Sequence, residues 1–220
     1  MRRYERGIWE MEIITREEFT VKIKKMLEMQ DALDQAILKE KALGLTKDDL
    51  FALTKTALIV EVSEATNVAE YFKHWKDHRG NKADAGKTHE ETLCEEFSDA
   101  FHFLLSLINQ KGSFKHVDAY LDKYIEEWFD ENVFNTNTGY LEYFEAMYNL
   151  NFNGSSTALF FTILNGELSN LFLTSTSSEY INTLFNFLAY TRVCGVTFND
   201  LYEAYMIKNK INYERLESGY

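Results

Sequence analysis

Proline is absent from this chain of 220 residues, cysteine occurs only twice, and no long hydrophobic run is present. Because proline breaks helix interiors, its absence favours a helical protein. Cys94 and Cys194 show neither metal-ligand spacing nor a disulfide pattern, so we expect reduced thiols in a cytoplasmic protein. No stretch approaches the roughly 20 apolar residues that span a membrane, and no apolar segment follows the charged N-terminus as in a signal peptide. We therefore expect no membrane association.

Basic residues are outnumbered, since 23 lysines and arginines face 35 acidic residues and the formal net charge is −12. An acidic surface repels a phosphate backbone, so direct nucleic-acid binding is not expected. A small phosphorylated substrate would need a local cation that neutralises its charge. Hydrophobic residues make up 45% of the chain and charged residues 26%, which is typical of a folded globular protein.

Apolar residues recur at helical spacing along most of the chain, and this pattern predicts an all-α fold. The expected helices span residues 16–41, 46–71, 88–109, 117–132 and 198–210. Thr46 is the expected N-cap of the second helix, and residues 79–87 form a polar, glycine-containing loop. Residues 135–178 are less regular, and we expect a helical insertion there. A short tail follows residue 210.

Four carboxylates stand in two pairs, Glu61 with Glu64 and Glu96 with Asp99. The spacing i, i+3 places both members of a pair on one helix face, and apolar residues flank each pair. If the two helices pack antiparallel, the four groups converge and repel one another unless a cation binds. Oxygen ligands suit magnesium or manganese. Either pair alone is usually a solvated acidic face, but the combination indicates a metal site.

Three further motifs accompany the carboxylates. Gln30 begins a Gln-x-x-Leu pattern on the first expected helix, and Trp75 begins a Trp-Lys segment after the first carboxylate pair. Residues 208–220 read Lys-Asn-x-x-Asn-x-x-Arg-x-x-x-Gly-Tyr, and His102 continues the second carboxylate motif. Together with the carboxylates, this order resembles the dimeric, all-α dUTPases, which belong with MazG to the all-α NTP pyrophosphatase superfamily.

The resemblance implies a magnesium-dependent dUTP diphosphatase, which hydrolyses dUTP to dUMP and pyrophosphate, with dUDP as a further candidate substrate. The implied metal ligands are Glu61, Glu64, Glu96 and Asp99. Among them, Glu64 is expected to be the general base that activates the attacking water. The residues implied to bind substrate are Gln30, Lys73, Trp75, Lys76, His102, Lys208, Asn212 and Arg215. The C-terminal members of this set are expected to lie on a tail that orders over the bound nucleotide.

The resemblance covers roughly the first 110 and the last 25 residues, and it divides the chain into three parts. Residues 1–112 form a catalytic helical core, and residues 113–196 form a variable helical insertion. Residues 197–220 form a C-terminal helix and a phosphate-clamping tail that return to the core. The resemblance also implies a homodimer, with each site completed by the partner chain. The variable segment is a candidate surface for a protein partner.

Three other interpretations fit parts of the pattern. A sibling enzyme, MazG-like or directed at dCTP, would use the same metal site with a different base pocket. A di-iron carboxylate bundle would need a Glu-x-x-His pair on each of two helices, whereas His102 lies six residues after Glu96 and no second pair exists. A non-catalytic acidic helical protein that binds other proteins would explain the net charge and the aromatic content.

Overall fold

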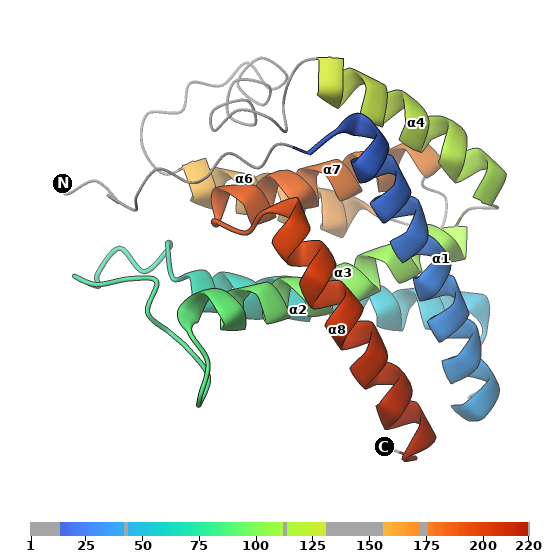
Figure 1. Ribbon diagram of the computed structural model, residues 1–220, viewed down its shortest axis with the longest axis horizontal. Coiled ribbons are helices and arrows are strands. Elements are labelled where there is room, and N and C mark those ends of the chain that lie inside the picture. The colour runs from blue at the N-terminus through green and yellow to red at the C-terminus, as the bar shows by residue number, and fades with distance from the viewer. Residues whose placement is uncertain (1–13, 42–43, 112–113, 131–155, 172–175, 220) are drawn as a thin grey trace.

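Helices account for all the regular structure in the computed structural model, which describes residues 14–41, 44–111, 114–130, 156–171 and 176–219 (Figure 1). The seven helices within these ranges are α1 (Arg16–Lys41), α2 (Lys47–Ala69), α3 (His89–Lys111), α4 (Phe114–Asp130), α6 (Ser156–Asn170), α7 (Ser177–Val193) and α8 (Phe198–Glu217). No strand occurs in the same ranges. The expected all-α fold class is therefore confirmed. Most of the irregular region expected at residues 135–178 lies outside the described residues.

Side-chain caps fix the starts of α2 and α8. The Thr46 hydroxyl accepts the backbone N–H of Asp49 at 3.1 Å, and the Asp49 carboxylate accepts the backbone N–H of Thr46 at 3.2 Å. Thr197 and Asp200 form the same reciprocal pair at 3.1 and 3.0 Å. Such capping boxes satisfy backbone donors that the first turn of a helix leaves free. Thr46 is thus confirmed as the start of the second helix.

The last helix is longer than expected. Ending it near residue 210 was wrong, because α8 continues to Glu217 and the expected tail is mostly helical. No proline or glycine occurs within α8, and Gly219 follows its end with a φ of 75°. Ile211 and Leu216 are partly buried, so packing as well as local preference supports the final turns.

Helix α7 was not expected as a separate element. Its residues from Tyr180 to Thr191 are almost all buried, and the side chains of Leu184, Phe185 and Phe187 have no exposed surface. A helix that is covered on all sides lacks the polar face that produces an amphipathic pattern. Periodicity therefore gave no signal for this helix.

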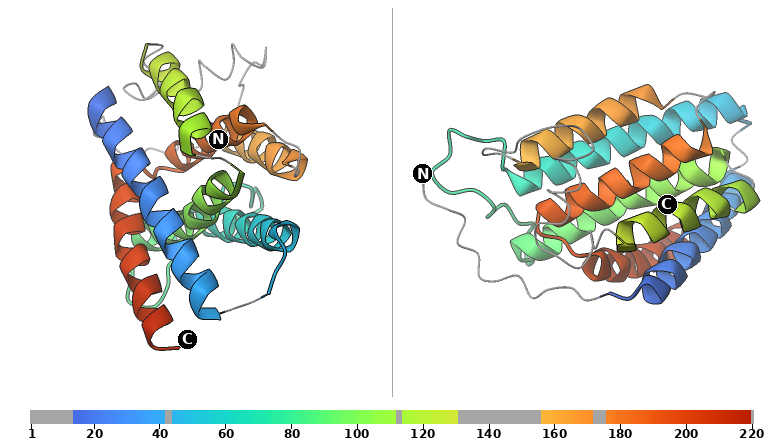
Figure 2. Two further views of the ribbon diagram at one scale, coloured as in Figure 1. Left: turned by 90° about the vertical axis from the view of Figure 1, so that its right-hand side faces the viewer. Right: turned by 90° about the horizontal axis from the view of Figure 1, so that it is seen from above.

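Two helix pairs position the site. Figure 1 shows α2 running toward the loop at residues 70–88 and α3 returning antiparallel beside it, which is the condition for the two carboxylate pairs to converge. Helices α1 and α8 lie side by side and run in the same direction across this pair (Figures 1 and 2). The contacts of Lys22 with Asn199 and of Gln30 with Tyr205 show that the two helices are parallel, because residue numbers increase together along both.

One hydrophobic core joins these helices to α4, α6 and α7. Phe101 of α3 stacks on Phe187 of α7 with ring centroids 5.5 Å apart, and Trp128 of α4 lies 4.6 Å from Phe185 of α7. The described part of residues 113–196 therefore shares its core with the rest of the chain. None of the described helices is long and apolar enough to cross a membrane.

The loop between α2 and α3 projects beyond the ends of both helices (Figure 1). One contact within the loop and two contacts to α3 hold it in place. An Arg79 nitrogen donates to the carbonyl of Tyr71 at 2.8 Å, and a ring nitrogen of the buried His89 lies 2.8 Å from the carbonyl of Lys82. The backbone N–H of Asp84 donates to the Thr92 hydroxyl at 3.0 Å. The expected polar loop is thus anchored to the start of α3.

Candidate active site

Three carboxylates converge between the antiparallel helices α2 and α3. Oxygen atoms of Glu61, Glu64 and Glu96 all lie within 4.8 Å of one another. Burial, followed by the charges of Asp99, Glu64 and Glu96, raises the pKa of Glu61 to about 7. Burial and the charges of Glu64 and Asp99 also raise the pKa of Glu96. This electrostatic cost is what a hard divalent cation would relieve, so the donor set fits such an ion.

The fourth expected carboxylate, Asp99, lies beside this group but binds a lysine. Its Oδ2 accepts a hydrogen bond from Nζ of Lys208 at 2.7 Å, and the Lys208 side chain is only 12% exposed. Burial raises the pKa of Asp99, while Lys208 opposes this shift. The charge of Asp99 contributes to the raised pKa of Glu61, so the two groups are close. The structure thus brings three carboxylates together and pairs the fourth with a cation at their edge.

A cavity of about 350 Å³ adjoins the carboxylates and is lined by residues of α1, α2, α3 and α8. Seven residues expected from the sequence line it, namely Gln30, Glu61, Asp99, His102, Lys208, Asn212 and Arg215. The other lining residues had no role assigned from the sequence, and they are Leu33, Asp34, Ile37, Lys41, Phe103, Ser106 and Leu216. Asp99 and Ser106 are seven residues apart, or about 10 Å along α3. The cavity therefore extends along α3 from Asp99 to Ser106.

Helix α8 supplies three of the lining side chains from one face. Lys208, Asn212 and Arg215 follow the spacing i, i+4, i+7, which places them in a row along the helix. These residues were expected on a tail that orders over the nucleotide. Instead, they belong to a regular helix packed on α1 and α3.

Gln30 is held by four hydrogen bonds to other side chains. Its amide nitrogen donates to Asp34 at 2.8 Å and to the Ser106 hydroxyl at 3.0 Å. Its amide oxygen lies 2.6 Å from Nδ1 of His102 and accepts from the Tyr205 hydroxyl at 3.2 Å. The amide nitrogen and the amide oxygen of Gln30 therefore each have two hydrogen-bond partners, and the oxygen orients the ring of His102.

Asp34 and Ser106 complete this network. The Ser106 hydroxyl donates to Asp34 at 2.6 Å, and burial raises the pKa of Asp34 to about 6. Asp34 lies four residues after Gln30 on the same helix, a spacing that could have identified it from the sequence.

His102 is buried yet lines the cavity. Its ring stacks on Tyr205 with centroids 4.2 Å apart. Burial lowers the pKa of His102 to about 3, the charge of Lys208 acts in the same direction, and the backbone carbonyl of Tyr205 opposes both. The imidazole is therefore neutral near pH 7. With the amide oxygen of Gln30 as its partner, Nδ1 is the nitrogen that carries the proton.

Five expected residues lie outside the cavity lining. Glu64 and Glu96 belong to the carboxylate cluster, and the other three are Lys73, Trp75 and Lys76. Lys73 and Lys76 both donate to Oε1 of the buried Glu70, at 3.0 and 2.6 Å. These bonds lower the pKa of Glu70 to about 2, and the bond from Lys76 has the larger effect. Trp75 is 65% exposed and packs edge-on against Phe72. Within one described chain, this segment does not meet the carboxylates.

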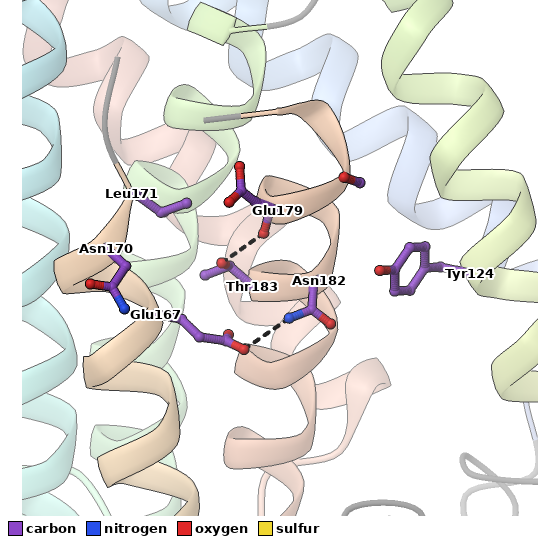
Figure 3. A pocket seen from close by; sticks show the side chains of 8 residues that line it. Tyr124, Glu167, Asn170, Leu171, Glu179, Asn182 and Thr183 are labelled. Atoms are coloured by element: carbon purple, nitrogen blue, oxygen red, sulfur yellow. Dashed lines mark hydrogen bonds between the residues drawn. The ribbon is translucent and has the colours of Figure 1, made fainter. Parts of the chain in front are cut away.

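A separate cavity of about 340 Å³ lies among α4, α6 and α7 (Figure 3). The Asn182 amide donates to the Glu167 carboxylate at 2.8 Å, and the Thr183 hydroxyl donates to the carbonyl of Glu179 at 2.9 Å. The residues that line it include no lysine or arginine. This cavity therefore suits a triphosphate less well than the cavity beside Lys208.

An all-α fold with a carboxylate cluster between antiparallel helices, next to a cavity lined by cations, defines a protein of the all-α NTP pyrophosphatase type. The family model of the all-α dUTPases matches residues 22–220, and the chain belongs to this dUTPase family. It is accordingly a dUTP diphosphatase, an enzyme that hydrolyses dUTP to dUMP and pyrophosphate. The family also indicates a divalent metal cofactor. No curated protein matches the chain significantly.

Proposed function

We propose that Glu61, Glu64, Glu96 and Asp99 bind magnesium, and that dUTP is hydrolysed where this group meets the cavity between α1, α3 and α8. The observation that carries the proposal is the approach of three carboxylates to within 4.8 Å. Magnesium prefers oxygen ligands and retains positions for substrate phosphates, and manganese has similar preferences. When bound, magnesium would neutralise phosphate charge and lower the pKa of a water molecule.

Glu64 is the general base in this proposal. It is the exposed member of the cluster, whereas Glu61 and Glu96 are partly buried, so its carboxylate can reach an incoming water. The water oxygen forms a bond to the α-phosphorus while the bond to the bridging oxygen breaks, and the water proton passes to Glu64. The electron pair leaves with pyrophosphate. In dUDP, which contains the same linkage, phosphate would leave instead.

The cavity positions the nucleotide around this reaction. Lys208 and Arg215 bind phosphate oxygens and offset the charge of the transition state. Asn212 offers an amide to the uracil, and Leu33, Ile37 and Phe103 supply apolar contacts for the ring. His102 lines the same region, with its orientation fixed by Gln30.

The active protein is proposed to be a homodimer in which Lys73, Trp75 and Lys76 reach the site of the partner subunit. The exposed Trp75 and its place outside the cavity of its own chain support this arrangement. Large exposed aromatic side chains are common at interfaces between subunits. Sedimentation of the purified protein would test the dimer, and a monomer at micromolar concentration would contradict it.

The division of the chain is also a proposal, with residues 1–112 and 197–220 as the catalytic unit and residues 113–196 as the variable part. All residues proposed to act on dUTP lie in the first and last segments. Substitution of the buried Phe185 in α7 by leucine should lower the melting temperature and leave KM for dUTP unchanged. Unbridged Cys94 and Cys194 suit a cytoplasmic location, which fractionation of cells would test.

The decisive experiment measures pyrophosphate release from dUTP, with dCTP, dTTP and UTP in parallel, in magnesium and in EDTA. We expect rapid, metal-dependent release from dUTP alone. Glu64→Gln should lower kcat at least about 100-fold with unchanged helical content, since general-base catalysis contributes roughly 10²–10⁴-fold. Glu40→Gln, at an exposed position of α1, is the matched control. Near-normal turnover by a folded Glu64→Gln protein would exclude Glu64 as the base.

A further inference from the structure

A second large cavity adjoins the proposed active site on the other side of Lys208. It has a volume of about 740 Å³ and lies between α3, the start of α8 and the loop before α3. Lys208 lines both this cavity and the nucleotide cavity. Lys87 and Glu95 line the second cavity together with it. The two cavities therefore meet at a lysine that already binds Asp99.

Lys87 belongs to an ordered row of alternating charges at this junction. Its Nζ contacts the carboxylate of Glu95 and lies 3.7 Å from Oδ2 of Asp84. Oε1 of Glu95 lies 3.8 Å from Nζ of Lys208, which in turn binds Asp99. The row thus runs from Lys87 through Glu95 and Lys208 to the edge of the carboxylate cluster.

The electrostatics of Glu96 place this row close to the cluster. The charges of Asp84 and Glu95, the two partners of Lys87, both contribute to the raised pKa of Glu96. Lys208 and Arg215 lower the pKa of both Asp99 and Glu95, whereas Lys87 acts on Glu95. Cations therefore lie at two places along this edge, with Lys208 beside Asp99 and Lys87 beside Glu95 and Asp84.

The loop that carries Lys87 is built to hold it there. The backbone N–H of Lys87 donates to the carbonyl of Asp84 at 3.1 Å, and the Asp84 backbone is tied to Thr92 of α3. Gly86, with a φ of 82°, takes the left-handed conformation that precedes Lys87. Lys87 and Glu95 are each 38% exposed, and an ion pair at such a position contributes little stability. A phosphate group can therefore replace Glu95 as the partner of Lys87 at small cost.

We propose that Lys87 binds the γ-phosphate of dUTP and stays with pyrophosphate as it leaves. This inference rests on the proposed metal site, which fixes the α-phosphate at the carboxylate cluster. If the uracil ring of dUTP lies in the nucleotide cavity near Ser106, the β- and γ-phosphates extend away from that cavity, toward Glu96 and Lys87. Cleavage adds charge to the departing pyrophosphate, and the Lys87 ammonium offsets it.

The test compares Lys87→Gln with Lys82→Gln, which removes the same charge from the same loop. Lys82 is exposed, and its contact with His89 uses the backbone carbonyl, which the substitution leaves in place. The measurements are KM and kcat for dUTP, the inhibition constant of pyrophosphate, and the affinity for dUDP as substrate or competitive inhibitor. Melting temperature and circular dichroism establish that each variant is folded.

We expect Lys87→Gln to raise KM for dUTP and the inhibition constant of pyrophosphate at least tenfold. The affinity for dUDP, which lacks the γ-phosphate, should change much less, and Lys87→Arg should restore most of the binding. Unchanged values for dUTP and pyrophosphate would overturn the inference, as would equal losses for dUTP and dUDP. Failure of the proposed function is a different result, because wild type and Lys82→Gln would then also fail to release pyrophosphate from dUTP.

Discussion

At the scale of single residues, Glu61 is held by the fold close to other carboxylates, and a bound cation would relieve the repulsion between them. Its pKa is raised to about 7 by burial and by the charges of Asp99, Glu64 and Glu96. Without metal, the folded protein therefore holds a proton on Glu61 at pH values where the unfolded chain has lost it. A bound cation competes with this proton, so metal affinity should increase as the pH rises to about 7.

This proton makes stability depend on pH in a defined direction. The pKa of Glu61 is higher in the folded state than its ordinary value of 4.5, so its contribution to stability is complete below about pH 4.5 and is lost as pH rises through about 7. In EDTA, Glu61→Gln should therefore gain stability relative to wild type between about pH 5 and 7.5. Urea unfolding of both proteins at several pH values measures this difference.

The difference in unfolding free energy between wild type and Glu61→Gln isolates the effect of Glu61 from those of the other titrating groups. Asp34, with its raised pKa, and His102, with its lowered pKa, are present in both, so their effects cancel in the difference. A difference that stays constant over this pH range would contradict the raised pKa of Glu61. Excess magnesium should reverse the order, since wild type retains the ligand that the variant has lost.

At the scale of elements, α8 combines a structural and a functional side. Tyr205 and Asn209 are buried, Tyr205 against α1 and α3, whereas Lys208, Asn212 and Arg215 line the nucleotide cavity. The helix therefore holds these three side chains in place before substrate arrives. A prearranged row of this kind lowers the entropy cost of binding a triphosphate.

Removal of residues 212–220 tests this separation. The deletion removes Asn212 and Arg215 but leaves Tyr205 and Asn209, so kcat/KM for dUTP should fall at least 100-fold while the melting temperature falls by only a few degrees. Activity assays and thermal unfolding by circular dichroism measure the two effects. Lys210→Gln, at an exposed position of the same helix, should be close to wild type. A truncated protein with unchanged turnover would contradict the role of α8.

Residues at helical spacing predicted α1, α2 and α3 because each of these helices buries one side and exposes the other, and a cap marks the start of α2. It failed for α7, which is buried on all sides. The spacing of the four carboxylates drew attention to them, and the family resemblance indicated the five other expected residues that line the cavity. Their roles remain predictions. The saturated amide of Gln30 was not predictable, since it depends on Ser106 and Tyr205, which are distant in sequence.

At the scale of the whole molecule, the exposed Trp75 could contribute to the active site of its own chain or to that of a partner subunit. Glu70 fixes the base of its loop through Lys73 and Lys76, so the indole is presented outward by a braced segment. A braced and exposed aromatic side chain is suited to contact another subunit. The proposed dimer gives it a place in the partner's nucleotide cavity.

Mixed dimers test this assignment. Trp75→Ala and Glu64→Gln chains should each be nearly inactive alone, but dimers that contain one of each have one site with both residues intact. We therefore expect coexpression of the two chains to restore up to about half of the wild-type activity per mixed dimer, as measured by pyrophosphate release. No recovery in purified mixed dimers would show that Trp75 and Glu64 act within the same chain.

The parallel contact of α1 with α8 has a consequence for synthesis on the ribosome. Lys22 and Asn199 are 177 positions apart, so α1 cannot form its contact with α8 until nearly the whole chain has been synthesised. At about 5–20 residues per second, this delay lasts on the order of ten seconds or more, during which buried side chains such as Phe101 lack part of their cover. A chain whose translation stops before α8 would carry its carboxylates and lack a nucleotide cavity. Premature termination should therefore yield a substrate for chaperones and proteases, and no residual enzyme.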